Sequence, residues 1–172
     1  MYEPDPEAEE AMMTNQAKAC LTFNAACDAA LEMEAQLYKN LLSALRIVKD
    51  KSASEILQNA ASVRLGIKQR LEIAALKGGL NEEEVKSAVP IMNLAQSIRC
   101  CDLHRITTGA DNRKALAYSI QMFKDAFDFY HDMTERCSGA PMAQLFKSFR
   151  DDQTRYLQQL EDTYEEHFLT EG

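Results

Sequence analysis

The sequence has no tryptophan, three histidines, six glycines and four prolines among its 172 residues. So few helix breakers leave long stretches that can be continuously helical. No apolar run approaches the ~20 residues that a helix needs to cross a bilayer. The acidic N-terminus, MYEPDPEAEE, also lacks the features of a signal peptide. We therefore expect no association with a membrane and a cytoplasmic location.

Sequence signatures of common enzyme classes are missing as well: there is no GxGxxG, Walker-type loop, GxSxG or CxxC. The net charge of −8 argues against nonspecific binding to nucleic acid. Five cysteines are spread along the chain without tight framework spacings, so we expect reduced, mostly buried thiols. Cys100, Cys101 and His104 form a CCxxH arrangement that could bind a metal, although it lacks a second ligand pair. Buried thiols at a helix end are the alternative.

What the chain does contain is helical periodicity. Apolar residues recur every three or four positions and no window alternates as a strand would, so we predict an all-α protein. The expected layout is a single domain with an N-terminal extension (1–20), a first helical hairpin (21–79), a helical crossover (80–111) and a second hairpin (112–170). Expected start and stop signals are Ser52 or Ser54, Gly78-Gly79, Asp111 or Asn112, and Pro141.

The two hairpins share one design. The segment ALEMEAQLYKNLLSAL around Tyr38 is echoed by SIQMFKDAFDFYHDM around Tyr130, and a second helical run follows each. Over roughly residues 20 to 168, this pattern resembles the rubrerythrin branch of the ferritin-like superfamily. The resemblance implies a four-helix bundle with one long crossover, a di-metal centre between the hairpins and association into oligomers, with a dimer expected.

The ligand positions that this resemblance implies are occupied by other residues. Carried over onto this sequence, they are Leu31, Arg64, Ile67, Phe123, Gln153 and Tyr156. Apolar side chains donate nothing to a metal, and a permanently charged guanidinium would repel one. We therefore expect no metal cofactor. The alternative is a register shift of one helical turn, which could assemble a di-iron or di-manganese site from Glu34, Glu72, Asp152 and Glu161.

A polar network is the other way to fill the centre of the bundle. Glu34 and Asp152 interrupt otherwise apolar helix seams, and Arg64 lies near the same depth. Since an unpaired buried charge is costly, we predict that these groups pair in place of a metal site. Further hydrogen bonds are expected from Tyr38, Tyr130, Gln153 and Tyr156. The alternative is that Arg64 extends to the surface and Glu34 is half exposed. A small basic patch for an anion or an acidic partner is predicted at Arg99, His104, Arg105 and Arg113.

Three functions fit these features. The first is a non-catalytic, metal-free ferritin-like bundle that acts through protein association, as a homo-oligomer. The second is a rubrerythrin-like di-iron oxidoreductase or peroxide-handling protein with shifted ligands. The third is a helical assembly or secretion chaperone. The missing metal donors favour the first.

Overall fold

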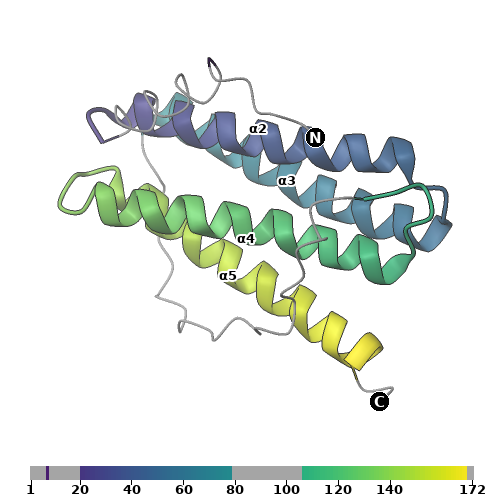
Figure 1. Ribbon diagram of the computed structural model, residues 1–172. Helices are drawn as coiled ribbons and strands as arrows, with labels where there is room; N and C mark the ends of the chain where they lie inside the picture. Colours follow the sequence, from purple (N-terminus) through teal and green to yellow (C-terminus); the bar gives the residue numbers. More distant parts are fainter. Residues whose placement is uncertain (1–6, 8–19, 79–105, 170–172) are drawn as a thin grey trace.

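The computed structural model describes residues 7, 20–78 and 106–169 (Figure 1). Four α-helices make up most of this part: α2 (Phe23–Ile47), α3 (Lys51–Lys77), α4 (Asn112–Arg136) and α5 (Ala143–Tyr164). A short π-helix, η3 (Glu165–Leu169), continues α5. Because residues 20–78 and 106–169 contain no strand, the prediction of an all-α, four-helix protein is confirmed. In this same part, no helix combines the length and the apolar composition needed to span a membrane.

The boundaries of α3 follow its capping residues. Asp50 caps the N-terminus, its carboxylate accepting the backbone N–H of Ala53 at 2.8 Å. The helix therefore starts before Ser52 and Ser54, the two residues expected to open it. Aspartate competes well for this position because it can satisfy a free N–H of the first turn. Gly78 ends the helix with a φ of +71°, a left-handed conformation that glycine adopts without steric cost.

The other helix ends show the same local chemistry. Thr22 caps α2, and Asp111 caps α4, where its carboxylate accepts the N–H of Lys114 at 2.9 Å. For α4 the expected cap is confirmed. The expected start of α5 at Pro141 is two residues early, because Pro141 lies in a turn and the cap is Met142, which makes no side-chain capping bond.

The helices form two antiparallel hairpins, α2 with α3 and α4 with α5 (Figure 1). The hairpins pack together mainly through α3 and α4, which run side by side in the same direction. As a result, α3 ends at one end of the bundle and α4 begins at the other. The segments expected as an N-terminal extension (1–20) and a helical crossover (80–111) lie largely outside the described residues.

The core lies where the apolar faces of the four helices meet. Fully buried side chains occur at helical spacing along every helix, among them Leu41, Leu57, Leu71, Ile120 and Phe146. Burial of a large apolar side chain stabilises the folded state by roughly 1.5–3 kcal/mol. The hydrophobic core is therefore the main source of stability, and any polar group inside it needs a specific explanation.

The cysteines are arranged differently from the prediction. Cys20, just before α2, forms a disulfide with Cys137 at the end of α4, 117 residues away, with the Cα atoms 5.1 Å apart. The expectation of reduced thiols is wrong for this pair, because the bundle brings together two helix ends that are distant in sequence. Cys27 is free and buried, and its burial raises the pKa of the thiol to about 11. Cys100 and Cys101 lie outside the described residues.

A buried polar cluster as the candidate functional site

Four polar side chains meet at the centre of the bundle, one from each helix. Glu34 comes from α2, Arg64 from α3, Tyr130 from α4 and Gln153 from α5, and all four are 0% exposed. Each lies on the inward seam of its helix, where an apolar residue would be ordinary. We call these four residues the central cluster.

Hydrogen bonds join the members of the central cluster into one chain. Nη1 of Arg64 donates to both carboxylate oxygens of Glu34, at 3.0 and 3.2 Å. Nη2 of Arg64 donates to the side-chain carbonyl of Gln153. The hydroxyl of Tyr130 donates to Oε1 of Glu34 at 2.8 Å. These hydrogen bonds connect α5 to α3, α3 to α2 and α2 to α4, so they link the two hairpins.

Aromatic rings enclose the ion pair. The guanidinium of Arg64 lies over the ring of Phe123, 4.2 Å from its centroid, and the ring of Tyr130 stacks on Phe149 with the centroids 5.6 Å apart. A desolvated cation over an aromatic face is stabilised by up to about 2 kcal/mol. Two buried donors, Nε of Arg64 and Nε2 of Gln153, have no hydrogen-bond partner among the described residues. Each costs roughly 1–3 kcal/mol.

Burial dominates the electrostatics of the central cluster. Desolvation raises the pKa of Glu34 above its ordinary value, whereas Arg64 and the Tyr130 hydroxyl act in the opposite direction. The pKa of Tyr130 is raised well above its ordinary value, first by burial and then by the neighbouring Glu34. Tyr130 therefore keeps its proton and acts as a hydrogen-bond donor. The four residues therefore link the helices to one another, and none of them is exposed to solvent, where a substrate would arrive.

Three residues predicted for this network, Asp152, Tyr38 and Tyr156, make no hydrogen bond to the central cluster in the described part of the chain. Asp152 accepts hydrogen bonds from Arg70 at 2.6 Å and Arg155 at 2.8 Å, closer to the surface, and it does not contact Arg64. Tyr38 and Tyr156 are half-buried, and within the described residues neither hydroxyl bonds to the central cluster. The prediction fails here because seam position alone does not fix where a long side chain ends.

The residues carried over from the ferritin-like ligand positions do lie near one another. Arg64 contacts both Gln153 and Phe123, and the ring of Tyr156 packs against Phe123 with the centroids 5.7 Å apart. These four residues come from α3, α4 and α5. Ile67 is buried nearby on α3, one turn after Arg64, whereas Leu31 is only half-buried. The acid on α2 that joins the cluster is Glu34, one turn after Leu31.

The alternative metal site is not assembled. In the described part of the chain, no three or more His, Cys, Asp or Glu side chains are grouped so as to hold a metal ion. Glu34 is bonded to Arg64, Glu72 lies on the outer side of α3 within 3.5 Å of Lys68, and Asp152 is paired with arginines. The proposed set of Glu34, Glu72, Asp152 and Glu161 is therefore wrong as a ligand group.

Of the four residues predicted to form a basic patch, one, Arg113, lies in the described part of the chain. Arg113 lies in the first turn of α4, and its Nε donates to the hydroxyl of Tyr164 at 2.9 Å. That contact raises the pKa of Arg113. The other three members, Arg99, His104 and Arg105, lie outside the described residues.

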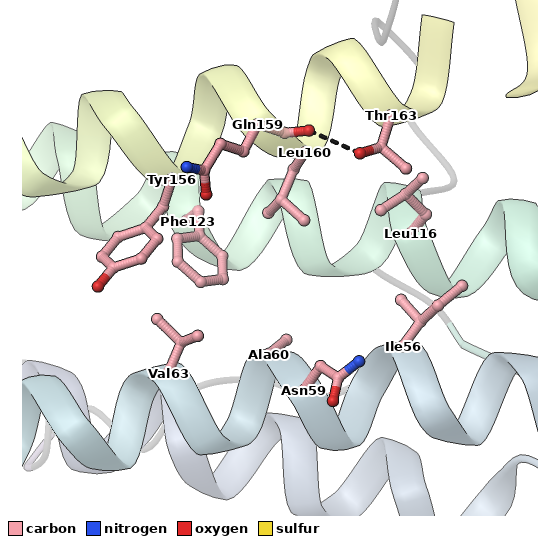
Figure 2. Close-up of a pocket in the computed structure, with 10 residues that line it drawn as sticks. All are labelled: Ile56, Asn59, Ala60, Val63, Leu116, Phe123, Tyr156, Gln159, Leu160 and Thr163. Atoms are coloured by element: carbon pink, nitrogen blue, oxygen red, sulfur yellow. Dashed lines mark hydrogen bonds between the residues drawn. The ribbon is translucent and has the colours of Figure 1, made fainter. Parts of the chain in front are cut away.

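Two grooves flank the contact between α3 and α4, and the seam pattern did not predict either. The neutral groove, about 300 Å³, opens between α3 and the α4–α5 hairpin; Figure 2 shows the side chains of α3 facing those of α4 and α5 across it. It is lined by Ile56, Asn59, Ala60, Val63, Leu116, Phe123, Tyr156, Gln159, Leu160 and Thr163. The acidic groove, about 330 Å³, lies between α2 and α4. It is lined by Met33, Gln36, Leu37, Asn40, Asp125, Phe129, Asp132 and Met133.

The chain matches no protein-family model, no curated protein and no solved structure. Its function is therefore inferred from the central cluster, from the two grooves and from the exposed apolar residues of the helices.

Proposed function

We propose that this protein is a non-catalytic, metal-free helical bundle of the ferritin-like type. It acts by associating with other proteins, and its main association is with a second copy of itself. One observation carries the proposal: the polar residues that could perform chemistry at the bundle centre, Glu34, Arg64, Tyr130 and Gln153, are entirely excluded from solvent. An acid or base acts on a substrate only from within hydrogen-bond reach of it.

The position of Arg64 supports the same proposal. The resemblance to rubrerythrins implies a metal ligand there, and this chain carries a permanent cation instead. The charge of Arg64 is already balanced by the carboxylate of Glu34, 3.0 Å away. Removal of either partner would leave an uncompensated charge in the core. A bundle closed in this way needs no metal ion to hold its hairpins together.

The outer face of α3 offers a surface for self-association. Leu65, Ile73 and Leu76 are 36%, 47% and 88% exposed, and they follow one another at helical spacing. Gln69 lies on the same face, and the exposed pair of Glu72 and Lys68, 3.5 Å apart, lies beside it. Exposed apolar residues that line up on one helix mark an interaction surface more often than scattered ones do. We infer that two copies bury this face against each other.

The cellular location can be tested through the disulfide. The sequence predicts a cytoplasmic protein, but the disulfide between Cys20 and Cys137 is typical of oxidising compartments. Titration of free thiols, in protein purified without reductant and then denatured so that the buried Cys27 reacts, distinguishes the two. Three titratable thiols indicate an intact disulfide and five indicate a reduced protein, since the sequence has five cysteines.

The proposed function is tested by sedimentation velocity combined with elemental analysis of the full chain. We expect a dimer with far less than stoichiometric iron or manganese, even after expression with added iron. The double substitution Ile73→Glu and Leu76→Glu should shift the dimer to a monomer, whereas Ile47→Glu, on a different exposed surface, should not. A monomer at every concentration, or a stoichiometric metal content, would contradict the proposal.

A further inference from the structure

We propose that the acidic groove binds a basic amphipathic helix of a partner protein. This inference rests on the proposed function, association with other proteins, and it adds a second surface and the chemistry of the partner. The occupant follows from the floor of the groove, from its charged residues and from its length.

The floor of the acidic groove is apolar and adaptable. It is formed by Met33 and Leu37 from α2 and by Phe129 and Met133 from α4. Methionine side chains are flexible and polarisable, so they can fit apolar anchors of different shapes. Phe129 is half-buried, and its ring is held edge-on against Tyr130 and Phe146, which fixes one wall of the groove. Such a floor suits the apolar stripe of a helix.

The charged residues that line the groove are both acids. Asp125 and Asp132 lie on α4, seven residues apart, and therefore on one side of that helix and about 10 Å from each other. Across the groove, α2 presents Gln36 and Asn40, whose side chains bond to each other at 2.9 Å. Lysine or arginine residues beside the apolar stripe of a partner helix would meet these carboxylates. The net charge of −8 also steers a basic partner toward the protein.

The length of the groove fits a helix rather than a small molecule. Its lining residues run along two turns of α2, from Met33 to Asn40, and along a matching stretch of α4. A helix lying in such a groove is anchored by apolar residues at i, i+4 and i+7. The volume of about 330 Å³ is large enough for such anchor side chains, while the body of the partner helix would remain outside.

The neutral groove provides an internal comparison. It has a similar volume, about 300 Å³, but its polar lining consists of amides and hydroxyls such as Asn59, Gln159 and Thr163 (Figure 2). None of the described residues that line it is charged, so it has no carboxylate to select a basic partner. A peptide that binds through charge complementarity should therefore distinguish the two grooves.

The probe is a fluorescently labelled synthetic peptide of about four helical turns, with leucine at i, i+4 and i+7 and lysine at the flanking positions. Binding is followed by fluorescence anisotropy with the full-length protein. We expect Asp125→Asn combined with Asp132→Asn to weaken binding by at least about tenfold, since charge pairs across an interface are lost. The control, Asp162→Asn combined with Glu165→Gln, makes the same change in net charge on exposed positions of α5 and η3 and should leave binding unchanged.

Two further comparisons test the shape of the site. Phe129→Ser should weaken binding, whereas Leu160→Ser, in the neutral groove, should not; circular dichroism confirms that both variants remain folded. A second peptide with glutamate in place of each lysine should not bind. Equal binding of both peptides, or an equal loss in the charge-matched control, would overturn the proposal, because attraction would then be nonspecific.

The remaining outcomes separate the two proposals. If the double asparagine variant changes the sedimentation of the protein alone, the groove holds a second copy and the basic-helix inference is wrong. If the protein is a dimer but the lysine peptide does not bind, the groove inference fails and self-association stands. If the protein is a monomer that binds the peptide through the acidic groove, self-association through α3 fails and the groove inference stands.

Discussion

Two arginines on α3, six residues apart, have partners of the same kind but lie in very different surroundings. Arg64 pairs with Glu34 and lies 4.2 Å from the ring centroid of Phe123. Arg70 pairs with Asp152 and lies 4.9 Å from the ring centroid of Phe149. The side chains of Arg64 and Glu34 are 0% exposed, whereas those of Arg70 and Asp152 are 36% and 13% exposed.

The difference in burial changes what each pair does. Water hydrates Arg70 whether or not Asp152 is present, so this pair contributes little to stability. The Arg64–Glu34 pair has been removed from water, and each charge depends on the other to offset its desolvation. Because the cost of desolvation offsets much of the attraction, such a buried pair does not by itself make the protein more stable. Its clearest consequence is that neither partner can be removed alone.

The largest expected effect separates the two arginines directly. Arg64→Ala should lower the free energy of unfolding by roughly 3–5 kcal/mol, because Glu34 remains buried without its partner and a large side-chain volume is lost. Arg70→Ala, the matched control, should cost about 1 kcal/mol or less. Chemical denaturation of both variants measures the difference. Equal losses would mean that the central cluster has no special role.

Replacement of both charges should cost less than replacement of one. Glu34→Leu leaves Arg64 as a buried permanent cation, so its cost should exceed that of Arg64→Met. Arg64→Met should be milder, because the unpaired carboxyl can take up a proton. The double variant should be more stable than either single variant, by on the order of 1 kcal/mol or more. A double variant that loses the sum of the two single losses would contradict the coupling.

The pH dependence of stability offers a finer test. Burial raises the pKa of Glu34, so above the ordinary carboxyl pKa the folded protein holds a proton that the unfolded chain has already released. Stability should therefore fall as pH rises through the range between the ordinary and the raised pKa. Glu34→Gln removes this contribution, and its unfolding free energy should fall less over the same range. Parallel curves for the two proteins would contradict the assignment.

The smallest effect is expected at Asp152. Asp152→Asn should destabilise the protein by about 1 kcal/mol or less, because both of its arginine partners are partly exposed. The loss should shrink further in about 1 M salt, where the screening length is only about 3 Å. The corresponding loss for Arg64→Ala should change much less with salt, since ions do not reach the central cluster. Equal salt sensitivity would place both pairs in contact with solvent.

Much of the fold could be predicted from local sequence. Helical periodicity predicted all four helices, and Gly78 and Asp111 were recognised as ends because their chemistry acts within a few residues. The same local reasoning missed Asp50 as the cap of α3, because the serines that follow it were equally plausible caps. The disulfide between Cys20 and Cys137 was missed for another reason: its partners are separated by 117 residues, and spacing in the sequence carries no signal for such a pair.

The candidate site was predictable only in part. Glu34, Arg64, Tyr130 and Gln153 were named because they lie on or near the inward seams of their helices. The assignment of Asp152 to the same network was wrong. Asp152 pairs instead with two nearer arginines, Arg70 and Arg155. Competition among partners depends on three-dimensional distances that a seam position does not contain.

By itself, the sequence determined that the chain is helical, where α3 ends and α4 begins, and which face of each helix turns inward. These features depend on periodicity and on capping chemistry within a few residues. The tertiary structure decided which arginine is buried, which acid it pairs with, and that two grooves of different charge open beside α3 and α4. Those outcomes depend on how far apart the packed helices lie and on how much water remains between them.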